Sequence, residues 1–143
     1  MNQQINRLKQ KGFTFMEIMV VIVIIAILAV MIVPNILKRV DQARVAKAEN
    51  DIRSLETALD TYKLDNGIYP STEQGLGALT AKPSGSPIPS NWNGPYVKQL
   101  PKDPWNNFYQ YAMPGKHGDD SYDVWSKGPP GENKEIGNWN LQQ

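Results

Sequence analysis

The apolar residues of this 143-residue chain are concentrated in one continuous run near the N-terminus. Residues 1–12 are polar, with Arg7, Lys9 and Lys11 as their only charged side chains, whereas residues 13–33 contain a single charged residue. As a helix, residues 13–33 would extend roughly 31 Å, which matches a hydrocarbon core of ~30 Å. The pattern predicts a membrane-spanning helix, with the basic flank on the cytoplasmic side.

A second helical pattern follows Pro34. Apolar residues recur there at steps of three and four, which predicts an amphipathic helix with one buried face. This stripe consists of Val45, Ala48, Ile52, Leu55, Leu59 and Tyr62. Pro34 removes a backbone hydrogen bond and crowds the preceding turn, so we expect a kink or local melting there. We predict one long, weakened helix, with residues 13–33 as its membrane part and residues 34–63 as its amphipathic continuation, before a stop at Gly67.

Residues 64–143 are rich in turn residues and aromatic side chains and are predicted to form a globular domain. A short helix is expected over residues 73–79, and residues 82–94 have no clear periodicity and should form a loop. The four tryptophans are predicted to pack in this domain rather than to form a ligand cage.

Short strands are the third expected element of this domain. Aromatic and polar residues alternate in residues 108–113 and 121–125, which predicts two strands, and a third is expected near residues 96–100. The fold class is therefore α+β, with the amphipathic half of the long helix packed on a small antiparallel sheet.

The composition excludes several classes of function. Fifteen basic residues face fourteen acidic ones, so the chain lacks the basic excess of a nucleic-acid-binding protein. Without cysteine, neither a disulfide framework nor a thiolate metal site can form. His117 is the only histidine, and no glycine-rich phosphate loop or His-Glu metal motif is present. We therefore expect a protein that is not an enzyme.

The start of the apolar run indicates how the chain is processed. An ordinary secretory signal has a shorter apolar region of about 7–15 residues, followed by a small-residue cleavage site. No such site follows Val33, and Gly12 instead lies just before the run. Cleavage at Gly12 would leave the apolar helix on the mature protein. On hydropathy alone, an uncleaved signal anchor is an equally good reading.

Glu17 is the unusual residue of the apolar run. A carboxylate inside a membrane span costs about 2.5–3.5 kcal/mol, which makes it a candidate for function. Glu17 lies one helical turn after Phe13, so it could neutralise a free amine at Phe13 in its own chain or in a neighbouring one. The alternative is that Glu17 lies near the interface and extends toward water.

The segment KGFTFMEIMVVIVIIAILAVMIVPN resembles the class III signal sequence of type IV pilins and type II secretion pseudopilins. The resemblance implies that a prepilin peptidase cleaves between Gly12 and Phe13 and methylates the new amino group of Phe13. It also implies that Glu17 docks subunits during assembly. Phe15 stands where leucine is more usual, a change that keeps the position apolar.

The C-terminal half carries a narrower resemblance, to the major pseudopilin family of type II secretion, in YKLDNGIYPSTEQGL, LPKDPWNNFYQY and IGNW. General type IV pilins typically carry a C-terminal disulfide loop, which a chain without cysteine cannot form. The resemblance implies a structural subunit of the periplasmic pseudopilus, a filament that drives protein export. A surface filament subunit of the type IV pilus kind and a monomeric, membrane-tethered periplasmic binding module are the alternatives.

The same resemblance implies a location and a set of partners. The chain would be a single-pass protein of the bacterial inner membrane, with its C-terminal domain in the periplasm. Its partners would be copies of itself, minor pseudopilins, the inner-membrane assembly platform, prepilin peptidase and membrane lipid, and no nucleic acid.

Charged residues are candidates for lateral contacts in such a filament. Glu56 and Asp60 lie one turn apart on the predicted helix, and Lys98 is a candidate partner on a neighbouring subunit. Any one of these charges is equally well explained as merely solvated. Pro34, which weakens the helix, completes the set of assembly candidates.

Members of the family usually hold a calcium ion in the C-terminal loop, and calcium needs about 6–8 oxygen ligands. Here the corresponding stretch reads SKGPPGENKEIGNW, with Pro130 where the first aspartate is expected and Lys134 in place of a further acid. Glu132, Glu135 and Asp123, which belongs to a nearby acidic cluster, remain as weak candidates. We expect no family-type calcium site, and we expect the two consecutive prolines to stiffen the loop.

Overall fold

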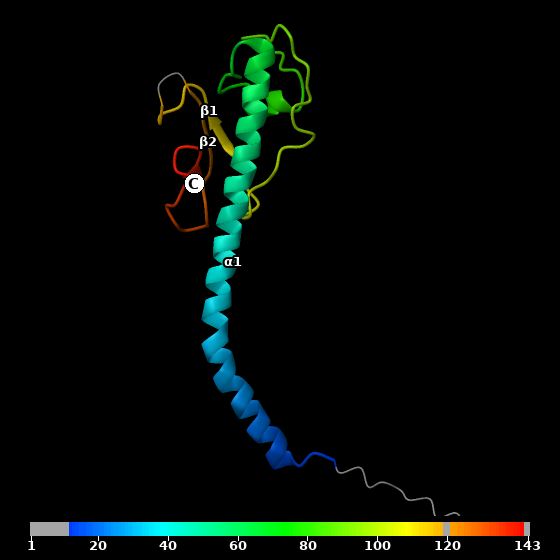
Figure 1. Ribbon diagram of the computed structural model, residues 1–143, viewed down its shortest axis with the longest axis vertical. Coiled ribbons are helices and arrows are strands. Elements are labelled where there is room, and N and C mark those ends of the chain that lie inside the picture. The colour runs from blue at the N-terminus through cyan, green and yellow to red at the C-terminus, as the bar shows by residue number, and fades with distance from the viewer. Residues whose placement is uncertain (1–11, 119–120, 142–143) are drawn as a thin grey trace, which may run out of the picture. The chain divides into compact units, whose positions relative to one another are not determined.

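The computed structural model describes residues 12–118 and 121–141 (Figure 1). Its first element is the helix α1, Phe15–Asn66, of 52 residues. The helix is continuous through Pro34, so the local melting expected at this residue is not found. Proline removes only its own N–H from the helix, and the residues on both sides keep helical backbone.

The chain divides into two compact units, and the first ends at Val40. All of its described residues, 12–40, are exposed, including the large apolar side chains between Phe15 and Val33. By length and composition, α1 contains a segment that can cross a membrane. An apolar helix surface with nothing packed on it is suited to lipid or to copies of the same helix.

The second unit, Asp41–Gln143, contains the hydrophobic core. The predicted stripe of α1 is confirmed from Ala48 to Tyr62, all of whose apolar positions are buried, whereas Val45 is only half-buried. The stripe packs with the 3-10 helix η1, Leu76–Leu79, and with buried side chains of the sheet region. The short helix predicted over residues 73–79 is therefore reduced to its last four residues.

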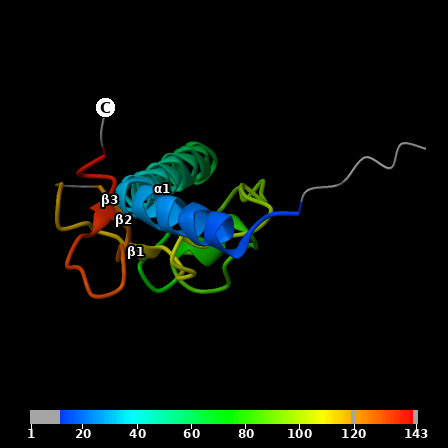
Figure 2. The same cartoon turned by 90° about the horizontal axis from the view of Figure 1, so that it is seen from below.

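The sheet has three antiparallel strands in the order β1-β2-β3 (Figures 1 and 2). These are β1, Gln110–Ala112, β2, Asp123–Ser126, and β3, Ile136–Gly137. Tyr111 pairs with Val124 between β1 and β2, and Ser126 pairs with Ile136 between β2 and β3. Figure 2 shows the three strands side by side.

The expected third strand near residues 96–100 is wrong. The backbone N–H groups of Tyr96 and Val97 both donate to the carbonyl of Leu79, at 2.8 and 3.2 Å, at the end of η1. Because these groups bond to η1, they do not join the sheet, and the edge of β2 pairs instead with the short strand β3 near the C-terminus.

The four tryptophans are all half-buried. Trp92 and Trp105 pack against the core, and the indole N–H of Trp92 donates to the carbonyl of Ala78 at 2.9 Å. Trp139 stacks on the ring of His117, with centroids 3.8 Å apart, and Trp125 lies 6.0 Å from Trp139. These contacts agree with the prediction of packing residues.

Three tyrosine hydroxyl groups connect the domain to the surface of α1. Tyr109 donates to Asp51 at 2.8 Å, Tyr69 donates to Asp60 at 2.9 Å, and Tyr96 donates to Asp65 at 2.8 Å. The three acceptors lie along the C-terminal half of the helix. Hydrogen bonds to charged acceptors are stronger than neutral ones, so these bonds stabilise the packing of the domain on α1.

Candidate processing and assembly sites

The N-terminus of α1 is organised by a capping box between Thr14 and Glu17. The hydroxyl of Thr14 accepts a hydrogen bond from the N–H of Glu17 at 3.2 Å, and a carboxylate oxygen of Glu17 accepts one from the N–H of Thr14 at 3.5 Å. This reciprocal pair satisfies two N–H groups that a helix end leaves free. The negative charge of Glu17 also lies at the positive end of the helix dipole.

Thr14 was not among the residues predicted to matter. Its signal is present in the sequence, because a threonine followed three residues later by glutamate, before an apolar run, is the pattern of a capping box. Glu17 therefore has an intramolecular role in the single subunit, in addition to its predicted role in docking.

The predicted cleavage site lies just before the helix. Gly12 and Phe13 are outside α1, and the side chain of Phe13 is 79% exposed. A Cβ at Gly12 would meet nothing within 4 Å, so the surroundings of this bond are open in the described structure. The rest of the predicted leader, residues 1–11, lies outside the described residues. Cleavage here and methylation of Phe13 stay predictions.

The two acidic candidates for lateral contacts differ in their surroundings. Asp60 is exposed and already accepts the hydrogen bond from Tyr69. Glu56 is half-buried, and burial together with the nearby charge of Asp60 raises its pKa, against the opposing effects of Arg53 and Asn138. Glu56 is therefore the acid whose charge would gain more from a further cation.

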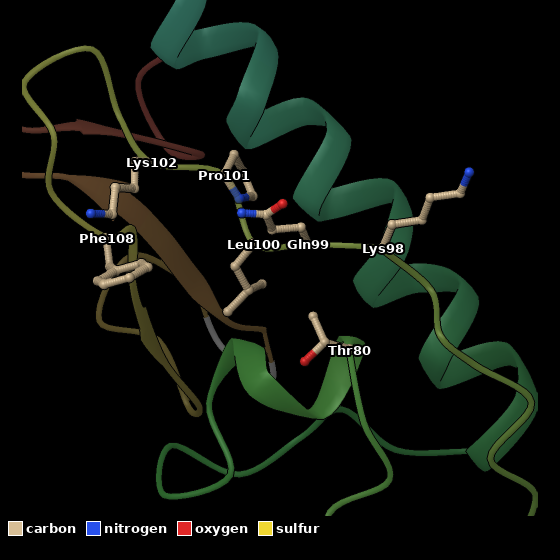
Figure 3. Close-up of a pocket in the computed structure, with 7 residues that line it drawn as sticks. All are labelled: Thr80, Lys98, Gln99, Leu100, Pro101, Lys102 and Phe108. Atoms are coloured by element: carbon tan, nitrogen blue, oxygen red, sulfur yellow. The ribbon is translucent and has the colours of Figure 1, made fainter.

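Lys98 borders an open groove of about 810 Å³, lined also by Thr80, Gln99, Leu100, Pro101, Lys102 and Phe108. Figure 3 shows Lys102 beside Phe108, whereas the side chain of Lys98 extends away from the other labelled residues. The ammonium group of Lys102 lies 5.1 Å from the centre of the Phe108 ring. Lys98 forms no ion pair within residues 12–118 and 121–141, so the structure does not bring it to Glu56 or Asp60 of the same chain.

The candidate calcium ligands do not form a cation site. Asp123 is buried in β2, and one of its oxygens accepts the N–H of Lys116 and contacts Nδ1 of His117, both at 2.8 Å. Glu132 and Glu135 are exposed on the loop between β2 and β3. Among the described residues, no three acidic or histidine side chains are grouped so that they could hold a metal ion.

This arrangement does not fit calcium, which needs several converging oxygen ligands. Pro130 and Lys134 supply no carboxylate to the loop, and both are exposed. The acidic residues Asp119 and Asp120 lie outside the described residues.

Two models of known protein families match this chain, and together they cover most of its length. A family model described as type II secretion system protein G matches residues 35–140. A second model, the prokaryotic N-terminal methylation motif, matches residues 7–33, a stretch that includes Gly12, Phe13 and Glu17.

Individual relatives match over nearly the whole chain. Type II secretion system core protein G of Pseudomonas aeruginosa is 50% identical over 142 residues, which cover 94% of this chain and 99% of the relative. The protein of the same name from Vibrio cholerae is 51% identical over 141 residues, covering 94% of each chain.

A solved structure agrees with both sequence comparisons. The crystal structure of the major pseudopilin from the type 2 secretion system of enterohaemorrhagic Escherichia coli aligns with a TM-score of 0.67 and 43% identity. The alignment covers 76% of this chain and 96% of the solved one. The long helix with its apolar half, the three-stranded antiparallel sheet and these matches place the chain in the protein G family of type II secretion systems, the major pseudopilins.

Proposed function

We propose that this chain is the structural subunit that polymerises into the periplasmic pseudopilus of a type II secretion system. The observation that carries the proposal is the division of α1 into two parts with different environments. Residues 48–62 bury their apolar stripe in the core, whereas every residue from 12 to 40 is exposed although most of this segment is apolar. Such a surface would be stabilised by contact with lipid before assembly and by contact with other apolar helices after it.

The same division supports a location and an orientation. The apolar part of α1 would anchor the subunit in the bacterial inner membrane, with the basic residues Arg7, Lys9 and Lys11 on the cytoplasmic side and the second unit in the periplasm. The partners would be further copies of the chain, minor pseudopilins, the assembly platform, prepilin peptidase and membrane lipid. The role is structural, and we propose no catalytic activity.

Glu17 would have a different partner in each state. In the single subunit, its carboxylate caps its own helix together with Thr14. Packing of apolar helices into a filament core removes water from this carboxylate, and an unpaired charge in such a place is costly. The amine created at Phe13 of a neighbouring subunit is a cation of suitable charge, so its approach would offset the cost and select the correct docking position.

The first test of this function is the mass of the protein purified from membranes after expression with and without prepilin peptidase. We expect the peptidase to remove residues 1–12 and to add one methyl group at Phe13. The variant Gly12→Val is the matched control, since a bulkier residue before the cleaved bond should leave the chain at full length. A wild-type chain that keeps its full mass beside an active peptidase would contradict the proposal and leave a signal-anchored domain.

A second measurement separates the pseudopilus from the two alternatives. Producing the processed chain in a type II secretion strain that lacks its own major pseudopilin should restore secretion. Restored surface filaments without secretion would indicate a subunit of the type IV pilus kind. A processed chain that stays monomeric and restores neither would indicate a tethered binding module.

A further inference from the structure

The loop between β2 and β3, residues 127–135, is anchored at its first end by a buried carboxylate. Asp103 is only 4% exposed, and its Oδ1 accepts the N–H groups of Trp105 and Asn107 at 3.0 and 2.8 Å. Its Oδ2 accepts the hydroxyl of Ser126 at 2.6 Å, and the oxygen of Ser126 in turn accepts the N–H of Gly128 at 3.0 Å. The carboxylate is therefore satisfied by three protein donors and connects the turn of residues 103–107 to Ser126 at the end of β2.

The second end of the loop is anchored by Asn140. Its side-chain amide donates to the carbonyl of Glu135 at 3.0 Å, and its side-chain oxygen accepts the N–H of Gly137 at 2.9 Å. A single asparagine thus bonds to the last residue of the loop and to the second residue of β3. The chain at Asn140 cannot move away from residues 135–137 without breaking both bonds.

The middle of the loop is closed by two glycines. Gly131 has a φ of 81° and follows Pro130 in a turn in which the N–H of Glu132 donates to the carbonyl of Pro129 at 3.2 Å. Proline followed by a positive-φ glycine is the pattern of a type II turn. Gly128 has a φ of 77°, and a Cβ at this position would overlap the carbonyl oxygen of Lys134.

These contacts use the oxygens that a cation in this loop would need. The carbonyls of Pro129 and Glu135 accept hydrogen bonds from protein groups, and the carbonyl of Lys134 lies against Gly128. The carboxylates of Asp103 and Asp123 are buried and accept protein N–H groups. Among the acidic side chains of the described loop, residues 127–135, only those of Glu132 and Glu135 remain, and both are exposed. Two flexible carboxylates fall short of the anionic oxygens that usually supply most of the ~6–8 ligands of calcium.

We propose that the β2–β3 loop is held closed by the protein's own groups, through Asp103 and Ser126 at one end and Asn140 at the other, and that the subunit reaches its full stability without calcium. The close approach of Gly128 to Lys134 and the turn at Gly131 complete this closure. The inference concerns the stability of the folded subunit and holds whether or not the chain assembles into a filament.

The test compares the thermal melting of the full chain in detergent micelles, followed by tryptophan fluorescence, in EGTA and in excess CaCl₂, with MgCl₂ as the control for ionic strength. We expect one melting temperature in all three conditions. A calcium site filled at one hundred times its Kd would raise the melting temperature by roughly 5–10 °C. A rise of that size with CaCl₂ and not with MgCl₂ would overturn the proposal.

Amide hydrogen exchange provides a readout at the loop itself. In EGTA, the N–H groups of Gly128 and Glu132 should exchange slowly, and CaCl₂ should not slow them further. Exchange in EGTA as fast as in an unstructured peptide would mean that protein groups alone do not close the loop.

Two pairs of variants identify the contacts responsible. Ser126→Ala should lower the melting temperature and speed exchange at Gly128 equally in EGTA and CaCl₂, whereas Ser84→Ala, at an exposed serine without a hydrogen bond in the described structure, should change neither. Gly128→Ala should be more destabilising than Gly131→Ala, because both glycines have positive φ but only Gly128 approaches another backbone group. Equal effects within either pair would contradict the proposed closure.

Discussion

The removal of one tyrosine hydroxyl should have opposite effects at two places in the core. Tyr109 and Tyr62 are both buried, at 6% and 0% exposure. The hydroxyl of Tyr109 donates to Asp51 at 2.8 Å, whereas that of Tyr62 has no hydrogen-bond partner among the described residues. Burial and the carboxylate of Asp51 raise the pKa of Tyr109, so its hydroxyl stays protonated and continues to donate at any ordinary pH. The substitutions Tyr109→Phe and Tyr62→Phe make the same chemical change in these different surroundings.

The structure sets the size of each effect. Tyr109→Phe removes a hydrogen bond to a charged acceptor. The carboxylate of Asp51 still pairs with Lys47 at 2.6 Å, and its side chain is 20% exposed, so its charge stays paired and partly solvated. We therefore expect a loss near the lower end of the usual range, about 2 kcal/mol of unfolding free energy. Tyr62→Phe removes a buried polar group without a protein partner, which should stabilise the fold by about 1 kcal/mol.

Urea unfolding of the full chain in detergent micelles, with the slope m checked for each variant, measures both changes. The two variants should differ by about 3 kcal/mol, which corresponds to melting temperatures roughly 6–12 °C apart. Equal losses at the two sites would refute the reasoning, because they would show that the contact with Asp51 contributes nothing beyond the burial of a ring.

Three further predictions follow from other contacts. Glu17→Gln keeps a side chain that can complete the capping box but has no charge, so the subunit should still insert and cap its helix but form no filaments in electron micrographs; normal filaments would exclude a role for the charge. Burial would raise the pKa of Asp123, but hydrogen bonds from the His117 ring and the Lys116 amide lower it, so its stabilisation is present above about pH 4 and lost as the pH falls through the lower folded pKa. Asp123→Asn should remove that part of the acid dependence in melting temperatures measured against pH, and an unchanged profile would contradict it. If Lys98 and Glu56 pair between subunits, Lys98→Glu should weaken filaments and Glu56→Lys should rescue them. Failure of rescue in subunits that fold normally would show that these two side chains do not pair.

The features that the sequence predicted correctly are local or periodic. The apolar run from residue 13 to residue 33 and the stripe from Ala48 to Tyr62 follow from the spacing of side chains along one helix, which needs no knowledge of distant residues. The capping box of Thr14 and Glu17 belongs to the same class, since both partners lie within one turn, and it could have been recognised from its spacing.

Pro34 shows the limit of such local rules. Proline in a helix interior predicts a kink or local melting, and the local melting does not occur, because the helix continues through Pro34. The rule describes the cost of one lost hydrogen bond and a crowded turn, whereas the outcome depends on all the bonds of a helix of 52 residues.

The tertiary structure decided the features that depend on partners far apart in the chain. Residues 96–100 have the composition of a strand, but the N–H groups of Tyr96 and Val97 bond to Leu79, and a two-residue strand at Ile136–Gly137 completes the sheet. The partner of a strand edge is set by which backbone reaches it, and the alternation of side chains does not encode that partner.

The same difference between local patterns and long-range contacts distinguishes the apolar half of α1 from the second unit. The sequence alone predicted an apolar helix with one carboxylate near its start, which the structure begins at Phe15, because hydropathy and spacing are properties of the segment itself. Only the fold determined that Asp103 is linked through Ser126 to a loop 25 residues further on, and that Asp60, expected to be a surface charge, accepts a hydrogen bond from Tyr69. Each of these contacts joins segments that meet only after the chain has packed around α1, so no pattern within either segment could predict it.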